Sequence, residues 1–285
     1  MFRKLTLTAA AVSLLAASPA LAFPFGKKAA AKTADAPAAG AKPKAAAPKA
    51  AQAPAPPRKA TAAERASAER MEPLARAAFW AREFEVDGAD ATAGTRLASA
   101  LRSLGQYDEA AQAASQVLVT QPENQEAMLE LARAHLAAGR GFHAIAPLKQ
   151  AQAMTPRDWK ILSLLGVAYD QVSRGGEAEA AWVQALALSP NNPAVLSNQA
   201  MHFAAAGDAA RAEQLLRLAV TQPGATIRER QNLTLVLGLQ GKLAEAEQLI
   251  RQDLPPEQAE ANLAYLRAAA GGAGRSWDQV KQSND

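Results

Sequence analysis

Alanine recurs every 34 residues through the middle of this chain, and this period constrains the fold more than any other feature. The alanine positions are Ala110, Ala144, Ala178, Ala212 and Ala246. A second series at the same spacing has glycine at four of its five positions, which are Gly105, Gly139, Ser173, Gly207 and Gly241. Two independent series in phase indicate an internal repeat, in which each unit buries its apolar face against the next.

The unit from Trp159 to Asn192 shows the internal pattern of one repeat. Its first half carries a cluster at helical spacing, made of Leu162, Leu165, Gly166 and Tyr169. Its second half carries another such cluster, made of Ala178, Trp182 and Ala185. The segment 173–176 separates the two clusters, so the unit is predicted to be two amphipathic helices joined by a tight turn.

Each recurring position has a physical role in such a hairpin. The alanine lies where the two helices cross, because only a small side chain permits axes about 8–10 Å apart. The glycine follows the first helix, where a left-handed C-terminal conformation disfavours residues with a Cβ. Proline then separates one hairpin from the next, because it cannot continue a helix. It stands at Pro122, Pro156 and Pro190 and shifts by one position to Pro223.

The repeats are predicted to run over 91–124, 125–158, 159–192, 193–226 and 227–260. The spacing L-x2-LG-x2-Y, then A-x3-W, then P, resembles the tetratricopeptide repeat pattern, with Leu162 where that family prefers tryptophan. The resemblance covers about 73–260. It implies an all-α fold, an α-solenoid in which helical hairpins form a right-handed superhelix.

The segments on either side of the repeats are predicted to cover the open ends of the stack. Residues 61–90 form an N-terminal helix or degenerate half repeat, with a capping box at Thr61 and Glu64. Its apolar face carries Met71, Leu74, Ala75, Ala78 and Phe79, followed by Trp80, which lies 34 residues before Ala114. A C-terminal capping helix is expected over 256–270, with Leu263 and Leu266 facing the repeats. Residues 271–285 are expected to be a flexible tail.

Residues 1–22 have the features of a secretory signal peptide. Arg3 and Lys4 precede a short apolar run, and cleavage is expected after Ala22. The alternative is an uncleaved anchor, although the run is short for a membrane span. Phe23 follows the cleavage position and the chain has no cysteine, so a lipid anchor at that point is not expected. These features predict a periplasmic protein, associated with the outer membrane only through partners.

Residues 23–60 are rich in Ala, Pro and Lys and are predicted to be a disordered linker. They hold eight Lys or Arg residues and one acidic residue, Asp35, a net charge of +7. Residues 1–22 contribute +2 of the chain's +4, so residues 61–285 carry −5. The repeats therefore lack the basic character of a nucleic-acid-binding domain. The linker is either a solvated spacer or a weak contact with an anionic envelope polymer or lipid.

No catalytic, cofactor-binding or metal site is predicted, and the chain is not expected to be an enzyme. The histidines His135, His143 and His202 are not paired with a second histidine or a carboxylate at metal-binding spacing. The turn glycines follow helices rather than strands, and no Lys-Ser/Thr follows them, so a phosphate loop is not indicated. The nucleophile pattern Gly-x-Ser-x-Gly is not present.

The remaining candidate is the inner, concave surface, which the family resemblance places on the first helix of each hairpin. The positions carried onto this chain are Leu129, Arg133, Lys160, Ser163, Val167, Asp170, Gln171, Ser197, Asn198, Met201, Gln231, Asn232 and Leu235. Asn198 and Asn232 are one period apart, so their amides are candidates for a ladder along an extended peptide. The alternative is that they are ordinary solvated polar residues.

A narrower resemblance rests on five segments. These are AFWAREFEVD (78–87), LSLLGVAYDQV (162–172), NPAVLSNQA (192–200), RQNLTLVLGLQGK (230–242) and DLPPEQAEANLAYLR (253–267). They look like the TadD-type tetratricopeptide repeat proteins of the Flp/Tad (tight-adherence) pilus system. The resemblance implies a non-enzymatic scaffold for protein partners, such as pilus or secretin components. The alternative is a general cell-envelope protein that tethers peptidoglycan or outer-membrane partners through its basic linker.

Overall fold

The structure, a computed structural model, describes residues 58–271, and these residues form thirteen α-helices and no strand. The helices of the five repeats are α3 (Ala91–Ser103), α4 (Tyr107–Thr120), α5 (Gln125–Ala137), α6 (Gly141–Met154), α7 (Trp159–Gln171), α8 (Gly175–Leu188), α9 (Pro193–Ala205), α10 (Ala209–Val220), α11 (Ile227–Leu239) and α12 (Leu243–Asp253). Two helices precede them, α1 (Ala62–Ala68) and α2 (Pro73–Val86), and one follows, α13 (Pro256–Gly271).

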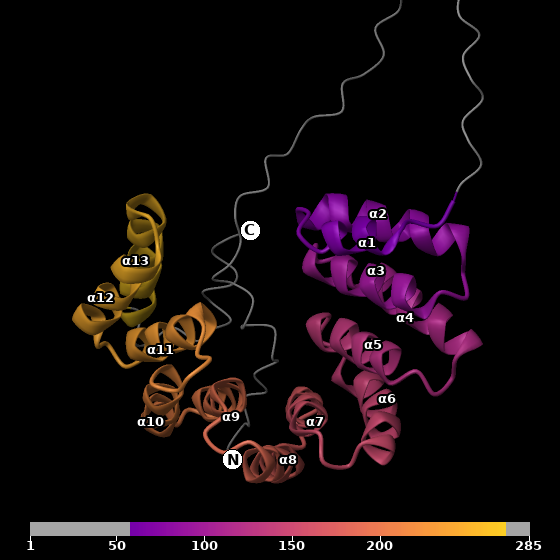
Figure 1. Cartoon of the computed structure of the whole chain (residues 1–285). Coiled ribbons are helices and arrows are strands. Elements are labelled where there is room, and N and C mark those ends of the chain that lie inside the picture. The colour runs from indigo at the N-terminus through magenta and orange to yellow at the C-terminus, as the bar shows by residue number, and fades with distance from the viewer. Residues whose placement is uncertain (1–57, 272–285) are drawn as a thin grey trace, which may run out of the picture.

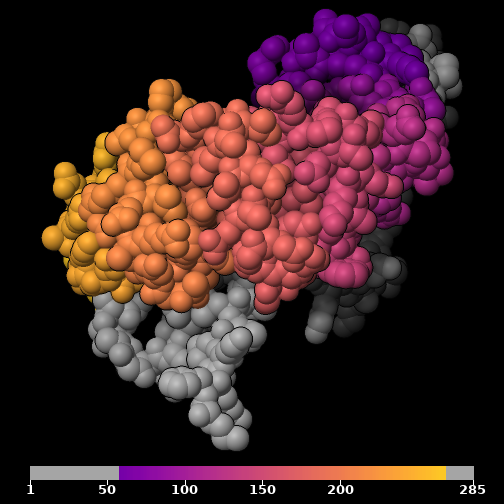
Figure 2. All heavy atoms as spheres, turned by 90° about the horizontal axis from the view of Figure 1, so that it is seen from below, coloured from indigo at the N-terminus to yellow at the C-terminus, as the bar shows by residue number. Residues whose placement is uncertain are grey.

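The helical hairpins stack into an open arc, as predicted for an α-solenoid. The first helices of the hairpins line the inner side of the arc and the second helices its outer side (Figure 1). Each first helix packs on its own partner and on the first helix of the neighbouring hairpin. Seen from below, successive segments follow one another across the molecule in sequence order (Figure 2). No residue pair needs to bridge the two ends, so stability depends on contacts between neighbours.

The recurring small residues lie where the hairpin geometry requires them. Ala110, Ala144, Ala178, Ala212 and Ala246 are completely buried. The turn after the first helix has a positive φ in every repeat, for example 71° at Gly139. Ser173 adopts the same conformation with φ at 61°, although a side chain makes this region less favourable. The turn geometry is therefore set by the stack and not by glycine alone.

The N-terminal segment, predicted over 61–90 as one helix or a degenerate half repeat, forms two helices, α1 and α2. The chain turns between α1 and α2, where Pro73 begins α2. Met71 and Leu74 were expected on the apolar face, but they are exposed, Leu74 by 72%. Trp80 is buried, together with Phe84, against α3 and the end of α4. The capping box of Thr61 and Glu64 is confirmed.

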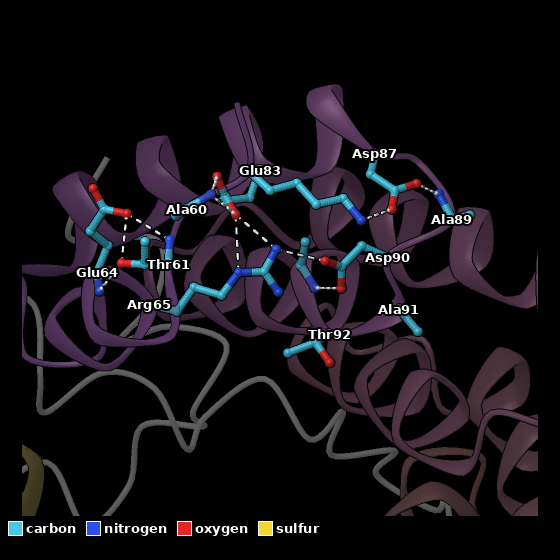
Figure 3. A network of polar contacts seen from close by, with 12 residues as sticks. Ala60, Thr61, Glu64, Arg65, Glu83, Asp87, Ala89, Asp90, Ala91 and Thr92 are labelled. Carbon is cyan, nitrogen blue, oxygen red and sulfur yellow. Dashed lines mark hydrogen bonds and ion pairs between the residues drawn. The ribbon is translucent and has the colours of Figure 1, made fainter. Parts of the chain in front are cut away.

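The predicted linker boundary at residue 60 is wrong by at least three residues. Arg58 pairs with Glu64, Lys59 pairs with Asp87, and the Ala60 N–H donates to both carboxylate oxygens of Glu83. Figure 3 shows the contacts around Glu83, Asp87 and Asp90, which join α1 to α2 and to the start of α3. The basic residues at the end of the linker are ordered here because acidic side chains of the folded part pair with them.

At the other end, α13 buries Leu263 and Leu266 against α11 and α12. It ends at Gly271, one residue beyond the predicted end of the capping helix at residue 270. The predicted signal peptide (1–22), the rest of the linker (23–57) and residues 272–285 lie outside the described residues. Within 58–271, none of the helices is long and apolar enough to cross a membrane.

Candidate functional site

The thirteen predicted partner-binding residues lie on α5, α7, α9 and α11, which line the inner side of the arc (Figure 1). We call the side chains that these helices and α3 present there the inner surface. Seven of the thirteen predicted residues are partly or fully exposed and have no hydrogen bond to a neighbouring repeat. They are Leu129, Arg133, Lys160, Val167, Met201, Gln231 and Leu235. They are the predicted residues left available to a partner.

The predicted amide ladder is wrong, because both asparagines are engaged within the protein. Asn198 Nδ2 donates to Ser163 Oγ at 3.1 Å, and Asn232 Nδ2 donates to Ser197 Oγ at 2.8 Å. Ser163, Ser197 and Asn232 are buried, Asn232 with 9% exposed. These pairs join the first helices of consecutive repeats and satisfy polar groups that would otherwise be buried without partners. The three buried residues are therefore structural.

Asp170 and Gln171 also serve contacts between repeats. Gln171 Nε2 donates to the carbonyl oxygen of Leu136 at 2.9 Å. Asp170 Oδ1 lies 2.6 Å from His202 Nδ1. Both side chains reach from one repeat to its neighbour, so the sequence interpretation of them as free groove residues is corrected.

His202 is the centre of a charged junction between the third and fourth repeats. One ring nitrogen, Nδ1, faces Asp170 on α7, and the other, Nε2, lies 3.7 Å from Glu179 Oε1 on α8. Its ring also contacts Trp182, with 5.5 Å between ring centroids. The hydrogen bond to Asp170 raises the pKa of His202, burial opposes the rise, and the charges of Asp170 and Glu179 reinforce it. The sequence did not reveal this pairing, because the two residues are separated by a full hairpin.

The junction predicts a pH-dependent stability. Folding raises the pKa of His202, so the protonated side chain stabilises the folded protein. This stabilisation is fully present below the unfolded pKa of about 6.5, and it is lost as pH rises through the folded pKa. The stability difference between the wild type and His202→Gln should therefore be largest at about pH 6 and shrink toward about pH 9. Urea unfolding across this range measures the difference.

Taking the difference in stability between the wild type and His202→Gln cancels the contributions of the other titrating groups. Burial lowers the pKa of His135, which favours stability at high pH in both proteins and cancels in the difference. His143→Gln, at an exposed position, is the matched control. A wild-type advantage that stays constant over the pH range would show that His202 does not act through its charge.

The other two histidines are closer than their sequence positions indicated. The rings of His135 and His143 have centroids 5.3 Å apart. No group of three metal-ligating side chains was found in residues 58–271.

The first two repeats place an arginine on the inner surface, Arg102, that sequence reasoning missed. Glu130 on α5, with 4% exposed, accepts from Arg102 Nε at 3.2 Å and from Arg133 Nη1 at 2.5 Å. Arg76 Nη2 on α2 reaches Ser103 Oγ at 3.4 Å. Two guanidinium groups, those of Arg102 and Arg133, thus meet at the buried Glu130 carboxylate. Arg102 lies two periods before Asp170, which was a predicted inner-surface residue. Extending that column by the 34-residue period could therefore have identified Arg102 from the sequence.

Comparison with known proteins agrees with this geometry. The sequence profile described as tetratricopeptide repeat matches residues 95–158 and 163–226. A solved structure of a thermophilic tetratricopeptide repeat protein from Thermus thermophilus is similar, with a TM-score of 0.55 and 25% identity. That match covers 61% of this chain and 96% of the other.

A second similar structure supports the fold alone. It is a tetratricopeptide repeat protein from Parabacteroides merdae, with a TM-score of 0.54 and 14% identity. The match covers 77% of this chain and 94% of that one. Among curated proteins, no sequence matches this chain.

Proposed function

Because this chain folds as a stack of tetratricopeptide repeats, we propose that it is a non-enzymatic scaffold that holds a segment of another protein on its inner surface. Tetratricopeptide repeat proteins mediate protein–protein interaction, and curved stacks of repeats use their concave side for binding. The observation that carries the proposal is the row of half-buried side chains from Arg133 through Val167 and Met201 to Leu235. Each is one period from the next and lies on the first helix of its repeat.

We further propose that the scaffold works in the bacterial periplasm, in the assembly of a Flp/Tad-type pilus or a related secretion system. Support comes from sequence alone. The charged start, the apolar run and the small residues before Phe23 favour export. The five segments that resemble TadD-type proteins favour the pilus role. The partner is then a pilus or secretin component, and association with the outer membrane runs through it.

A second candidate function follows from the charge of residues 23–60, which hold eight Lys or Arg residues and one acidic residue. A cationic segment attracts anionic polymers and lipid headgroups. In this alternative the segment tethers peptidoglycan or the outer membrane while the repeats hold an envelope partner. Neighbouring genes separate the two candidates, because pilin, prepilin peptidase and secretin genes beside this one favour the pilus role.

Site-specific photocrosslinking in the living bacterium tests the proposal. A photoreactive amino acid at Met201 or Leu235 on the inner surface should crosslink to a pilus or secretin component, identified by mass spectrometry. The matched control is Val183, which is 59% exposed and lies on α8, a helix of the outer side of the arc (Figure 1). Equal crosslinking from both sides, or from Val183 alone, contradicts binding on the inner surface. Crosslinks from Met201 to other envelope proteins contradict only the pilus role.

A further inference from the structure

The inner surface changes its chemistry along the stack. One series of positions, each a period apart on successive first helices, reads Ser99, Arg133, Val167, Met201, Leu235. The first two members are polar or charged, and the last three are apolar. Val167 packs at the edge of the core of the third repeat, and Met201 and Leu235 pack at the edge of the core of the last two.

The residues around this series follow the same division. At the N-terminal end, Arg102 joins Arg133, and both pair with the buried Glu130. Arg102 and Arg133 keep about a third of their side chains exposed, at 31% and 29%. A guanidinium carries five N–H donors, so one shared carboxylate leaves most of them free for a ligand.

At the C-terminal end the neighbours of the series on α11 and α13 include apolar side chains, beside the polar Gln231. Leu239 on α11 is 38% exposed. Tyr265 on α13 is half-buried and packs at the edge of the same core cluster as Leu235. The asparagines and serines of this region pair with one another between repeats and offer a partner little hydrogen bonding. Burial of apolar side chains is therefore the main source of binding energy expected here.

We propose that the occupant of the inner surface is a two-part polypeptide segment, with carboxylates over the first two repeats and apolar side chains over the last three. This inference rests on the proposed function. Arginine binds carboxylates with paired hydrogen bonds, whereas Val167, Met201 and Leu235 accept apolar side chains. The four steps from α3 to α11 through α5, α7 and α9 at about 8–10 Å each span about 32–40 Å. At about 3.3 Å per residue, about 10–12 extended residues cover this length.

Two synthetic peptides of about 12 residues and identical composition test this layout. One has Asp and Glu in one half and Leu and Val in the other, and the second alternates them. Fluorescence anisotropy should show at least tenfold tighter binding of the two-part peptide, weakening as NaCl rises from about 50 to about 500 mM. A photoreactive group at its acidic end should label α3 or α5, and one at its apolar end should label α9 or α11.

Variants of the protein test each half separately. Arg133→Gln should weaken binding of the two-part peptide at least tenfold and remove most of the salt dependence. Glu130 keeps Arg102 as its partner in this variant. Met201→Gln with Leu235→Gln should weaken binding to a similar extent and leave the salt dependence intact. Arg251→Gln and Val183→Gln, at exposed positions of α12 and α8, are matched controls that should bind like the wild type. Melting curves of all variants confirm that the repeats remain folded.

Three outcomes overturn the inference: equal binding of the alternating peptide, reversed labelling of the two ends, or no binding of either peptide. Each is distinguishable from failure of the proposed function. Photocrosslinks from Met201 to an envelope protein in the cell would keep the scaffold role, and only the two-part chemistry of its ligand would be lost.

Discussion

Replacing Trp182 by alanine is expected to lower the free energy of unfolding by about 3–5 kcal/mol. The Trp182 side chain is 1% exposed and fills the centre of the third hairpin. Its Nε1 donates to the carbonyl oxygen of Ser163 at 3.2 Å, so it also ties α8 to α7. Alanine would leave a cavity that the neighbouring repeats cannot close. Urea unfolding followed by circular dichroism measures the loss.

Gly166 explains why a tryptophan fits at this position. A Cβ on Gly166 would lie 2.3 Å from Trp182 Nε1, far inside contact distance. Gly166→Ala is therefore expected to destabilise the protein by about 1–3 kcal/mol through overpacking. The preceding repeat carries Ala132 and Leu148 at the same two positions of the period.

That difference between repeats supplies the control. The double variant Gly166→Ala with Trp182→Leu copies the pair of the preceding repeat and should be more stable than the sum of the single losses predicts. Coupling between contacting residues is about 0.5–3 kcal/mol. Additive single effects, or a Gly166→Ala protein that melts like the wild type, would contradict direct contact between these two positions.

Replacing Arg65 by methionine is expected to release α1 from the rest of the protein. Arg65 donates Nε and Nη2 to Glu83 Oε2 at 3.0 and 2.7 Å and Nη2 to Asp90 Oδ2 at 2.6 Å (Figure 3). Glu83 is 3% exposed, and removing one partner of a buried ion pair costs about 3–5 kcal/mol. The seven-residue helix α1 buries only Ala68. It is therefore expected to detach so that water reaches the Glu83 carboxylate.

Limited trypsin digestion measures the detachment. Cleavage after Arg70, between α1 and α2, should become at least tenfold faster in Arg65→Met, because local opening limits access. The matched control is Arg96→Met, which removes an exposed ion pair with Glu69 worth about 0–1 kcal/mol. Adding Glu83→Gln to Arg65→Met removes the buried charge and should restore most of the resistance. If both arginine variants digest alike, the polar network does not hold α1.

The period made the hairpins predictable because their causes are local. A small residue at each helix crossing and a left-handed turn after each first helix are requirements of one unit, and they recur in each. The end segments were harder, since they lack the full pattern. Met71 and Leu74 have apolar character and helical spacing, yet they are exposed because the chain breaks before Pro73.

The helices that form the candidate site were predictable from the sequence, but which of their side chains are available to a partner was not. The helices that line the inner surface follow from the repeat, and Arg133, Met201 and Leu235 lie on them. The pairs Ser163–Asn198 and Ser197–Asn232 were missed, although each is separated by 35 residues, one more than the period. In these two pairs, the serine faces not the equivalent position of the following repeat but the residue after it. The sequence pattern alone does not specify this offset.

The sequence by itself therefore determined the length of the repeat, the crossing of its two helices and the chemistry of each position. Only the tertiary structure decided which polar side chains remain available to a partner. Stacking places consecutive first helices side by side, and at that distance short polar side chains such as Asn232 and Ser197 satisfy each other. Long side chains such as Arg133 reach beyond this layer and stay partly exposed.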